Sequence, residues 1–495
     1  MFGLKKLRFV DLGTGLSMMI GTAGLLVTSA LHAADPGCCT PAPSRPVIQG
    51  GGCCDKIYED AAEKLKNLNP GCCAPAGNAC AAPSACAPAT VCDPNAVFNG
   101  CGSTCGSGCG HGCGLLGGEL GEPWTVMSLF DNECGGNHLK DNGWVLGGFT
   151  QFGYQSGPDG AFAGNGPFVN QKEYKFFGLN QQYMYLGKVA DGSKGFDWGF
   201  RTDLIFGLDG NEGQAFGNVN GGHYDYFNGW NHGAYEWALP QLYAEVAIGD
   251  LSVKAGHFYT IVGYEVIPSN GNFFLSRQLT FYNSEPFTHT GVLGAYKVND
   301  KLTVQGGWTQ GMDTGFDDFN NGSSFLGGIT YVASENTTFI YTVTAGNLGW
   351  RGDGSINSFI ITQKWAEKFS TVHQFDVLGS NAPVDFNVNP TPTAFVPGAP
   401  GAGVANNSTG LINYAFYDIN AKTKAGVRYE WYKADGTSYQ TLTGGVNIKP
   451  IANLLIRPEV RYMFSEGNTQ TYTGPDYSGQ LFNQTQFGID AILTF

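Results

Sequence analysis

The sequence predicts an all-β fold: a transmembrane antiparallel β-barrel of about sixteen strands (roughly 14–18), preceded by a low-complexity arm rich in Cys, Gly, Pro and Ala. Three observations predict it. Only 14% of the residues are charged, whereas 74 of 495 are Gly and 13% are aromatic; ordinary soluble domains carry about 25% charged residues. Long segments of alternating polarity fill the chain after residue 142. All fourteen cysteines lie before that point, between Cys38 and Cys134.

Composition also excludes several classes of protein. The net charge of −14 argues against a nucleic-acid partner, which requires a basic face. The hydrophobic content of 42% excludes intrinsic disorder over the whole chain.

Residues 1–33 resemble a secretory signal peptide. Lys5, Lys6 and Arg8 form a basic start, an uncharged stretch follows over 16–30, and small residues precede Ala33 as a cleavage site. The alternative is a membrane anchor, but the apolar stretch is shorter than the ~20 residues that a spanning helix needs. We therefore expect export, with 34–142 in the periplasm.

Cysteine pairs and glycine repeats punctuate the arm over 34–142. An even cysteine count in an exported protein favours disulfides, within the arm or between chains. Cys109, His111 and Cys113 could supply three metal donors, but fixed CxxC pairs are missing, so neither a metal site nor a cofactor is expected. A short helix is expected near 56–67, in an otherwise irregular segment with no chemistry of its own.

From Gly143 onward the polarity alternates with period two, as in a strand with one apolar and one polar face. Over 196–206 the apolar set is Phe196, Trp198, Phe200, Leu204 and Phe206, and the polar set is Asp197, Gly199, Arg201 and Asp203. Strands of a soluble sandwich are usually about 5–6 residues long. These segments run to ten to fourteen residues, and a tilted strand needs about 9–11 residues to cross a membrane.

Sixteen such segments are predicted, and the gaps between them alternate between short and long, except that the gap 434–436 is short where a long one is expected. Short gaps on one rim and long loops on the other are typical of outer-membrane barrels. The segments are 144–154, 176–189, 196–209, 237–248, 251–262, 288–298, 301–310, 324–333, 337–346, 356–365, 369–379, 411–420, 422–433, 437–448, 453–464 and 484–495.

A barrel of this kind has to close, because lipid offers no partner to an unpaired backbone group. About sixteen strands leave an aqueous lumen rather than a filled core. The last segment alternates up to a terminal aromatic residue, Phe495, and resembles the C-terminal signature of proteins delivered to the barrel assembly machinery.

Charged residues on the polar faces are the candidates for the pore lining, because such side chains set ion preference. For each of them, an ion pair that holds the wall is the alternative role. The candidates are Arg201, Asp203, Glu245, Lys254, Arg428, Glu430, Arg457, Glu459 and Arg461.

The long loop 263–287 carries Glu265, Arg277 and Glu285 among several phenylalanines. We expect this loop to fold inward and narrow the pore, with these three residues at the constriction. The alternative is a lid packed at the mouth.

Two further loops are acidic, 210–236 with Glu212, Asp225 and Glu236, and 311–323 with Asp313, Asp317 and Asp318. They could attract cations at the vestibule, although solubility alone also explains them.

No zinc, P-loop or serine-hydrolase motif occurs, and catalysis is not expected. His257, His289 and His373 are the histidines to examine for the alternative of a barrel hydrolase.

Two segments carry a family resemblance: GYEVIPSNGNFF at 263–274 and EPFTHTGVLGAY at 285–296. With the surrounding barrel, they resemble the OmpL-like family of β-barrel porins that is abundant in planctomycetes. The resemblance covers about 143–495 and implies a porin-like barrel without naming a solute.

Together these observations predict an outer-membrane porin that passes small hydrophilic solutes or ions by diffusion. Its expected partners are outer-membrane lipid, the barrel assembly machinery, two further copies in a homotrimer by analogy with sixteen-stranded porins, and other chains through disulfides of the arm. The alternative is a structural or adhesive outer-membrane protein with a plugged barrel and a cross-linked arm.

Overall fold

The computed structural model describes residues 120–132, 136–156, 177–215, 224–226, 229–230, 235–318, 320–381, 407–434, 437–465 and 484–495. The expected signal peptide, nearly all of the arm with its helix near 56–67, and all fourteen cysteines lie outside these residues. In this part of the chain, no helix has the length and apolar character needed to cross a membrane.

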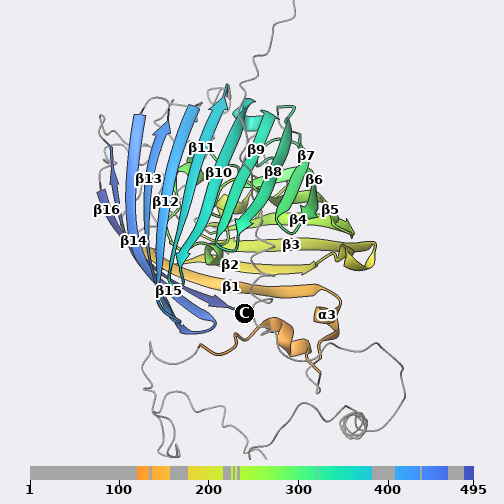
Figure 1. Ribbon diagram of the computed structural model, residues 1–495, viewed down its shortest axis with the longest axis horizontal. Coiled ribbons are helices and arrows are strands. Elements are labelled where there is room, and N and C mark those ends of the chain that lie inside the picture. Colours follow the sequence, from red (N-terminus) through yellow and green to blue (C-terminus); the bar gives the residue numbers. More distant parts are fainter. Residues whose placement is uncertain are drawn as a thin grey trace, which may run out of the picture. The chain divides into compact units, whose positions relative to one another are not determined.

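The described residues form sixteen strands in one closed antiparallel barrel, in which each strand pairs with its neighbours in sequence and β1 pairs with β16 (Figure 1). The strands are β1 (Trp144–Gln155), β2 (Gly178–Lys188), β3 (Asp197–Gly207), β4 (Glu236–Ile248), β5 (Leu251–Tyr259), β6 (Thr288–Asn299), β7 (Leu302–Thr309), β8 (Ser323–Ser334), β9 (Thr337–Asn347), β10 (Asp353–Ala366), β11 (Phe369–Ser380), β12 (Asn407–Asn420), β13 (Thr423–Ala434), β14 (Thr437–Ile451), β15 (Leu454–Phe464) and β16 (Gln484–Thr494). The predicted fold class is confirmed.

Short helical turns accompany the strands. They are η1 (Val126–Phe130), α3 (His138–Asp141), η4 (Gly192–Lys194), α4 (Gly210–Gly213), η5 (Ser269–Gly271), α5 (Leu279–Asn283) and η6 (Gly349–Arg351). Before β1, the Asn137 side chain caps α3 by accepting from the Lys140 amide, and the Asn453 side chain bonds both the amide and the carbonyl of Trp124.

Alternation along each strand separates an inner face from an outer one. On β13, Arg428 and Glu430 are fully buried, whereas Val427 and Tyr429 are 48% and 36% exposed. Because successive side chains of a strand point to opposite faces, the exposed apolar set forms the outer surface, which suits lipid. The polar set points into the barrel.

The seam between the first and last strands is completed by the final residue. The amide and carbonyl of Phe495 exchange hydrogen bonds of 3.0 Å with the carbonyl and amide of Gly148. The Phe495 ring lies so close to Gly148 that a Cβ there would come within 2.9 Å of it. The C-terminus therefore takes part in closing the barrel.

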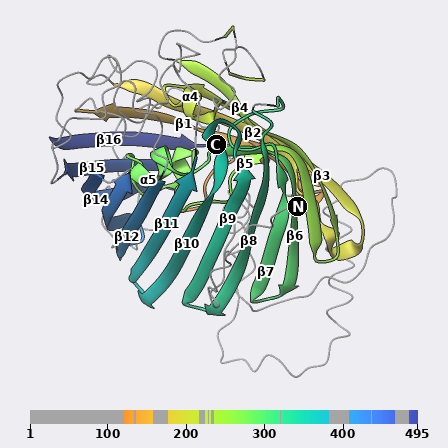
Figure 2. The same ribbon diagram turned by 90° about the horizontal axis from the view of Figure 1, so that it is seen from above.

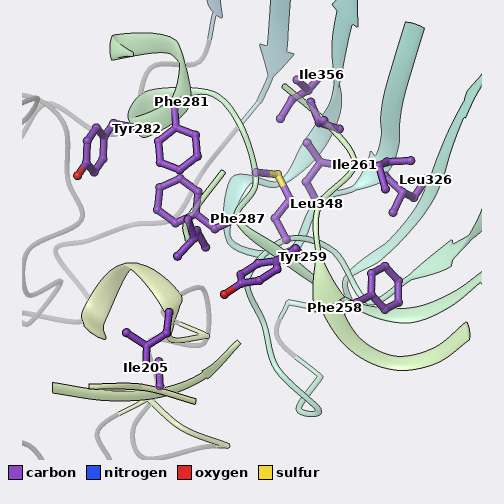
Figure 3. Close-up of a cluster of buried hydrophobic side chains, with 14 of the residues drawn as sticks. Ile205, Phe258, Tyr259, Ile261, Phe281, Tyr282, Phe287, Leu326, Leu348 and Ile356 are labelled. Carbon is purple, nitrogen blue, oxygen red and sulfur yellow. The ribbon is translucent and has the colours of Figure 1, made fainter. Parts of the chain in front are cut away.

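The long loops share a hydrophobic cluster (Figure 3). Phe281 stacks on Phe287 with ring centroids 4.6 Å apart, Ile261 of the same loop lies in the same cluster, and Leu348 joins it from the loop between β9 and β10. Residues of different loops are therefore held together by apolar packing as well as by hydrogen bonds.

Candidate functional site

The loop that joins β5 to β6, residues 260–287, lies inside the barrel, and we name it the inner loop. It contains η5 and α5, and all five residues of α5 are buried. Figure 2 shows α5 within the ring of strands. Its hydrogen bonds reach inward-facing side chains of β11, β12, β13 and β15, on a different part of the wall from β5 and β6. The loop therefore crosses the interior, as the sequence predicted.

Strand β13 holds the inner loop through a carboxylate and a guanidinium. The Glu430 carboxylate accepts from the amides of Leu279 and Thr280 at 2.7 and 2.8 Å, at the start of α5. Arg428 forms an ion pair of 2.5 Å with Glu265 and donates to the Ser276 carbonyl. Both partners of the ion pair are buried, so geometry and hydrogen bonding have to offset their desolvation.

Strand β15 provides a second pair of contacts. The Glu459 carboxylate accepts from the amides of Leu275 and Ser276 at 2.8 and 3.1 Å. Arg457 pairs with Asp490 at 2.5 Å and donates to the carbonyls of Ser269 and Asn272. Charged wall residues thus satisfy backbone groups that an irregular buried segment would otherwise leave unpaired.

Uncharged wall side chains, which no charge pattern in the sequence singles out, complete the attachment. Gln181 of β2 accepts from the Ser269 amide and donates to the Ile267 carbonyl, each at 3.0 Å. Gln278 of the inner loop donates to Gln374 of β11 and Tyr414 of β12. Their only sequence signal is an inward strand position, which does not reveal the path of the loop.

Glycines on the inner wall admit the loop side chains. At each of four positions, a Cβ would meet a side chain of the inner loop: Gly410 against Thr280, Gly426 against Phe273, Gly445 against Phe274 and Gly488 against Leu275. Part of the high glycine content therefore serves this close approach of loop and wall.

The other predicted lining residues lie on β3, β4, β5 and β15. Arg201 pairs with Asp203, which also accepts from Tyr183 and Gln241. Glu245 and Lys254 face each other across the β4–β5 ladder, and both are half-buried. Arg461 of β15 is 1% exposed. The roles of these residues in permeation stay predictions.

The three predicted constriction residues are buried within the inner loop. Glu265 pairs with Arg428, and Arg277 donates to the carbonyls of Leu275 and Ile267. Glu285 accepts from Gln374 at 2.6 Å. In this structure the three side chains contact protein groups, so they shape the loop; a direct contact with solute stays a prediction.

Toward the short turns, the inner wall is more open. Inward side chains there are polar or aromatic and half-buried, which contrasts with the fully buried residues around the inner loop. They include Tyr185, Tyr243, Glu245, Lys254, Thr303, Gln305, Thr338 and Thr362. The lumen is therefore accessible to water at this end.

Two of the acidic loop residues, Asp225 and Asp313, have local structural partners. Asp225 accepts from the Ala215 and Leu239 amides, and Asp313 from those of Phe287 and Thr288. Burial raises the pKa of Asp313 to about 6. Glu236 is buried at the start of β4, Asp317 is half-buried and Asp318 exposed, while the side chain of Glu212 is not described.

The histidines of the hydrolase alternative lie in strands. His257 bonds the Thr290 hydroxyl, His289 bonds Thr260 and the Gly311 carbonyl, and His373 bonds Asn413 and Thr371. These contacts involve hydroxyl, amide and carbonyl groups and do not form a Ser–His–Asp arrangement.

Residues 139–495 match the family described as "Putative beta-barrel porin-2, OmpL-like". The chain belongs to this family. It is an outer-membrane β-barrel porin, and the OmpL-like resemblance of the sequence is confirmed at family level.

Solved structures similar to this porin include an outer-membrane channel, an outer-membrane protein and a porin. The channel DcaP of Acinetobacter baumannii aligns with a TM-score of 0.46 and 11% identity, over 71% of this chain and 97% of that one. OmpT of Vibrio cholerae, solved in a trimer form, gives 0.41 and 12%, over 71% and 99%. A mutant of the Rhodopseudomonas blastica porin gives 0.41 and 9%, over 71% and 100%. None of the curated proteins compared matches the sequence.

Proposed function

We propose that this porin passes small hydrophilic solutes or ions by diffusion, through a lumen that the inner loop narrows at one level. The observation that carries the proposal is the contrast along the barrel: the inner loop is anchored by buried charges, whereas inward side chains toward the short turns are half-buried. A fixed constriction next to an accessible lumen suits diffusion limited by solute size. The polar lining of the lumen suits hydrophilic solutes.

Planar-bilayer recording tests this function. Purified, folded protein is expected to give stepwise currents, because the proposal requires a water-filled path past the inner loop. Replacing both Glu430 and Glu459 by Ala removes the acceptors for four backbone amides of the inner loop. We expect this double variant to conduct more and with a larger solute cutoff.

The control is Glu335→Ala, in the exposed turn between β8 and β9, which should conduct like the wild type. An absence of stepwise currents from folded wild-type protein would contradict the porin proposal. Unchanged conductance of the double variant would contradict the constriction by the inner loop.

The alternative of a plugged structural or adhesive protein has one specific observation in its favour. The apolar cluster at the long loops joins Tyr226, Phe281, Met312 and Trp350, which come from four different loops. Packing of that kind could close the mouth completely. Bilayer recording separates the two proposals, because a plugged barrel gives no stepwise current.

We propose that the chain is of the type abundant in planctomycetes, that it is exported by residues 1–33 and that its arm stays in the periplasm, where disulfides join segments or chains. We further propose that three copies associate in outer-membrane lipid, that the barrel assembly machinery recognises Phe495, and that the protein has no enzymatic activity, nucleic-acid partner, metal or cofactor. Native mass and non-reducing gel mobility test the trimer and the disulfides.

A further inference from the structure

Two buried carboxyl groups meet where the inner loop returns to the wall. Glu285 follows α5 and is 3% exposed, and Asp376 of β11 is 1% exposed. The same amide nitrogen, Nε2 of Gln374, donates to Oε1 of Glu285 at 2.6 Å and to Oδ2 of Asp376 at 3.0 Å. Since both acids accept from one nitrogen, their carboxyl groups are close neighbours.

The groups around this pair do not neutralise two negative charges. Ser358 of β10 donates to Asp376 at 2.6 Å, and Tyr414 of β12 donates to Glu265. Two more carboxylates, Glu265 of the inner loop and Glu430 of β13, raise the negative potential at the pair.

The cations and the remaining hydroxyls nearby already have other partners. Arg428 of β13 pairs with Glu265. Arg351 of η6 donates to the Asn283 carbonyl. Tyr432 of β13 and Ser408 of β12 bond Ser284, next to Glu285. The pair therefore has hydrogen-bond donors around it but no direct ion-pair partner among the described residues.

The geometry indicates which acid carries a proton. Oε2 of Glu285 is buried and accepts no hydrogen bond from the described residues, whereas both oxygens of Asp376 accept one. Oε2 of Glu285 lies against Gly263, a glycine at φ +90° where any side chain would overlap the Glu285 carboxyl group. Burial first, and then the Asp376 carboxylate, raise the pKa of Glu285 well above its ordinary value.

We propose that Glu285 and Asp376 form a proton-operated latch, which fixes the C-terminal end of the inner loop to β11 while Glu285 is protonated and releases it when that proton is lost. The latch rests on the proposed function, because the inner loop has to narrow a conducting lumen for its release to matter. Two adjacent charges in a buried site repel each other. Hydration of the ionised Glu285 requires this end of the loop to leave the wall.

Single-channel recording across a pH series, from about pH 5 to about pH 10, tests the latch. The wild type should give a small, steady current at acidic and neutral pH. At alkaline pH the current should become larger and noisier, as Glu285 loses its proton. Glu285→Gln should lose this rise, because an amide stays uncharged at every pH. Asp376→Asn removes the other charge of the pair, so this variant should also show no rise in current at alkaline pH.

Glu335→Gln is the matched control, since it removes one carboxylate from an exposed turn and should keep the wild-type profile. The latch is wrong if conducting wild-type channels show no pH dependence, or if Glu285→Gln and Asp376→Asn both retain the alkaline rise. An absence of stepwise current at every pH would overturn the proposed porin function, and the latch with it.

Discussion

Arginine and lysine occupy different places in this barrel. Six arginines occur in 143–495, and each is 9% exposed or less: Arg201, Arg277, Arg351, Arg428, Arg457 and Arg461. Most lysines lie beside the short turns: Lys188, Lys194, Lys297, Lys301, Lys364, Lys368, Lys422, Lys424 and Lys449. A planar guanidinium donates several hydrogen bonds from one rigid group, which suits anchoring a buried loop, whereas an ammonium on a flexible stem suits a hydrated rim.

Replacing Arg428 by Met tests this anchoring role at a single residue. Methionine keeps much of the volume but leaves the buried Glu265 carboxylate without its ion-pair partner. Breaking a buried pair in this way costs about 3–5 kcal/mol. We expect unfolding of Arg428→Met in urea, followed by heat-modifiable gel mobility, at clearly lower concentrations than for the wild type.

The control for this variant is Lys297→Met, which breaks the exposed pair with Asp300. Exposed pairs contribute about 0–1 kcal/mol, so its unfolding midpoint should stay near that of the wild type. Equal midpoints for the two variants would show that the Arg428–Glu265 pair does not hold the loop.

At the scale of elements, the strands were predictable and the inner loop contacts were not. All sixteen predicted strands agree with the observed bounds to within four residues, for example 369–379 against Phe369–Ser380. Period-two alternation is a local signal, because each residue needs only its two neighbours to define a face. The contact of Glu430 with Leu279 joins residues 151 positions apart, and alternation carries no information about it.

In the candidate site, too, the strand faces were predictable and the contacts with the inner loop were not. Alternation selected Arg428, Glu430, Arg457 and Glu459 for the pore lining, but it could not show that the inner loop covers them. Gln181 and Gln374 were not selected at all, because an uncharged polar residue in a strand is unremarkable until the loop path is known. Sequence therefore indicates which face a residue occupies, and the three-dimensional path of a loop decides what that residue contacts.

The wall glycines give a prediction at the element scale. A Cβ at Gly426 would overlap the Phe273 ring, whereas a Cβ at Gly444, on the neighbouring strand, would meet nothing within 4 Å. We expect Gly426→Val to displace the inner loop and to lower stability in urea by about 1–3 kcal/mol, the usual cost of overpacking. Gly444→Val is the control, and it should be neutral or slightly stabilising because Val favours strands. A normal unfolding midpoint for Gly426→Val would mean that Phe273 can leave the wall freely.

At the scale of the whole molecule, the barrel combines two kinds of interior. Around the inner loop it is packed like a soluble core, with buried ion pairs and aromatic contacts. Toward the short turns it keeps half-buried polar side chains. A closed barrel makes this combination feasible, because its backbone hydrogen bonds are satisfied whether or not the lumen is filled.

Closure of the barrel involves its last residue, Phe495. The Phe495 backbone bonds Gly148 across the seam, and these bonds do not need the ring. Phe495→Ala should therefore retain a stable, conducting barrel after refolding from urea into detergent or lipid. In cells, the same variant should give much less heat-modifiable protein in the outer membrane if the assembly machinery recognises the terminal aromatic residue.

Leu493→Ala is the matched control for Phe495→Ala. Leu493 lies on β16, two residues before Phe495, is 48% exposed, and also loses apolar surface on substitution. Comparable outer-membrane yields of the two variants would show that apolar surface, rather than the terminal aromatic residue, governs assembly. A Phe495→Ala variant that also fails to refold in vitro would instead place the ring among the contacts that close the seam. Measuring yield in cells and refolding in vitro for both variants thus separates recognition of the C-terminus from closure of the barrel.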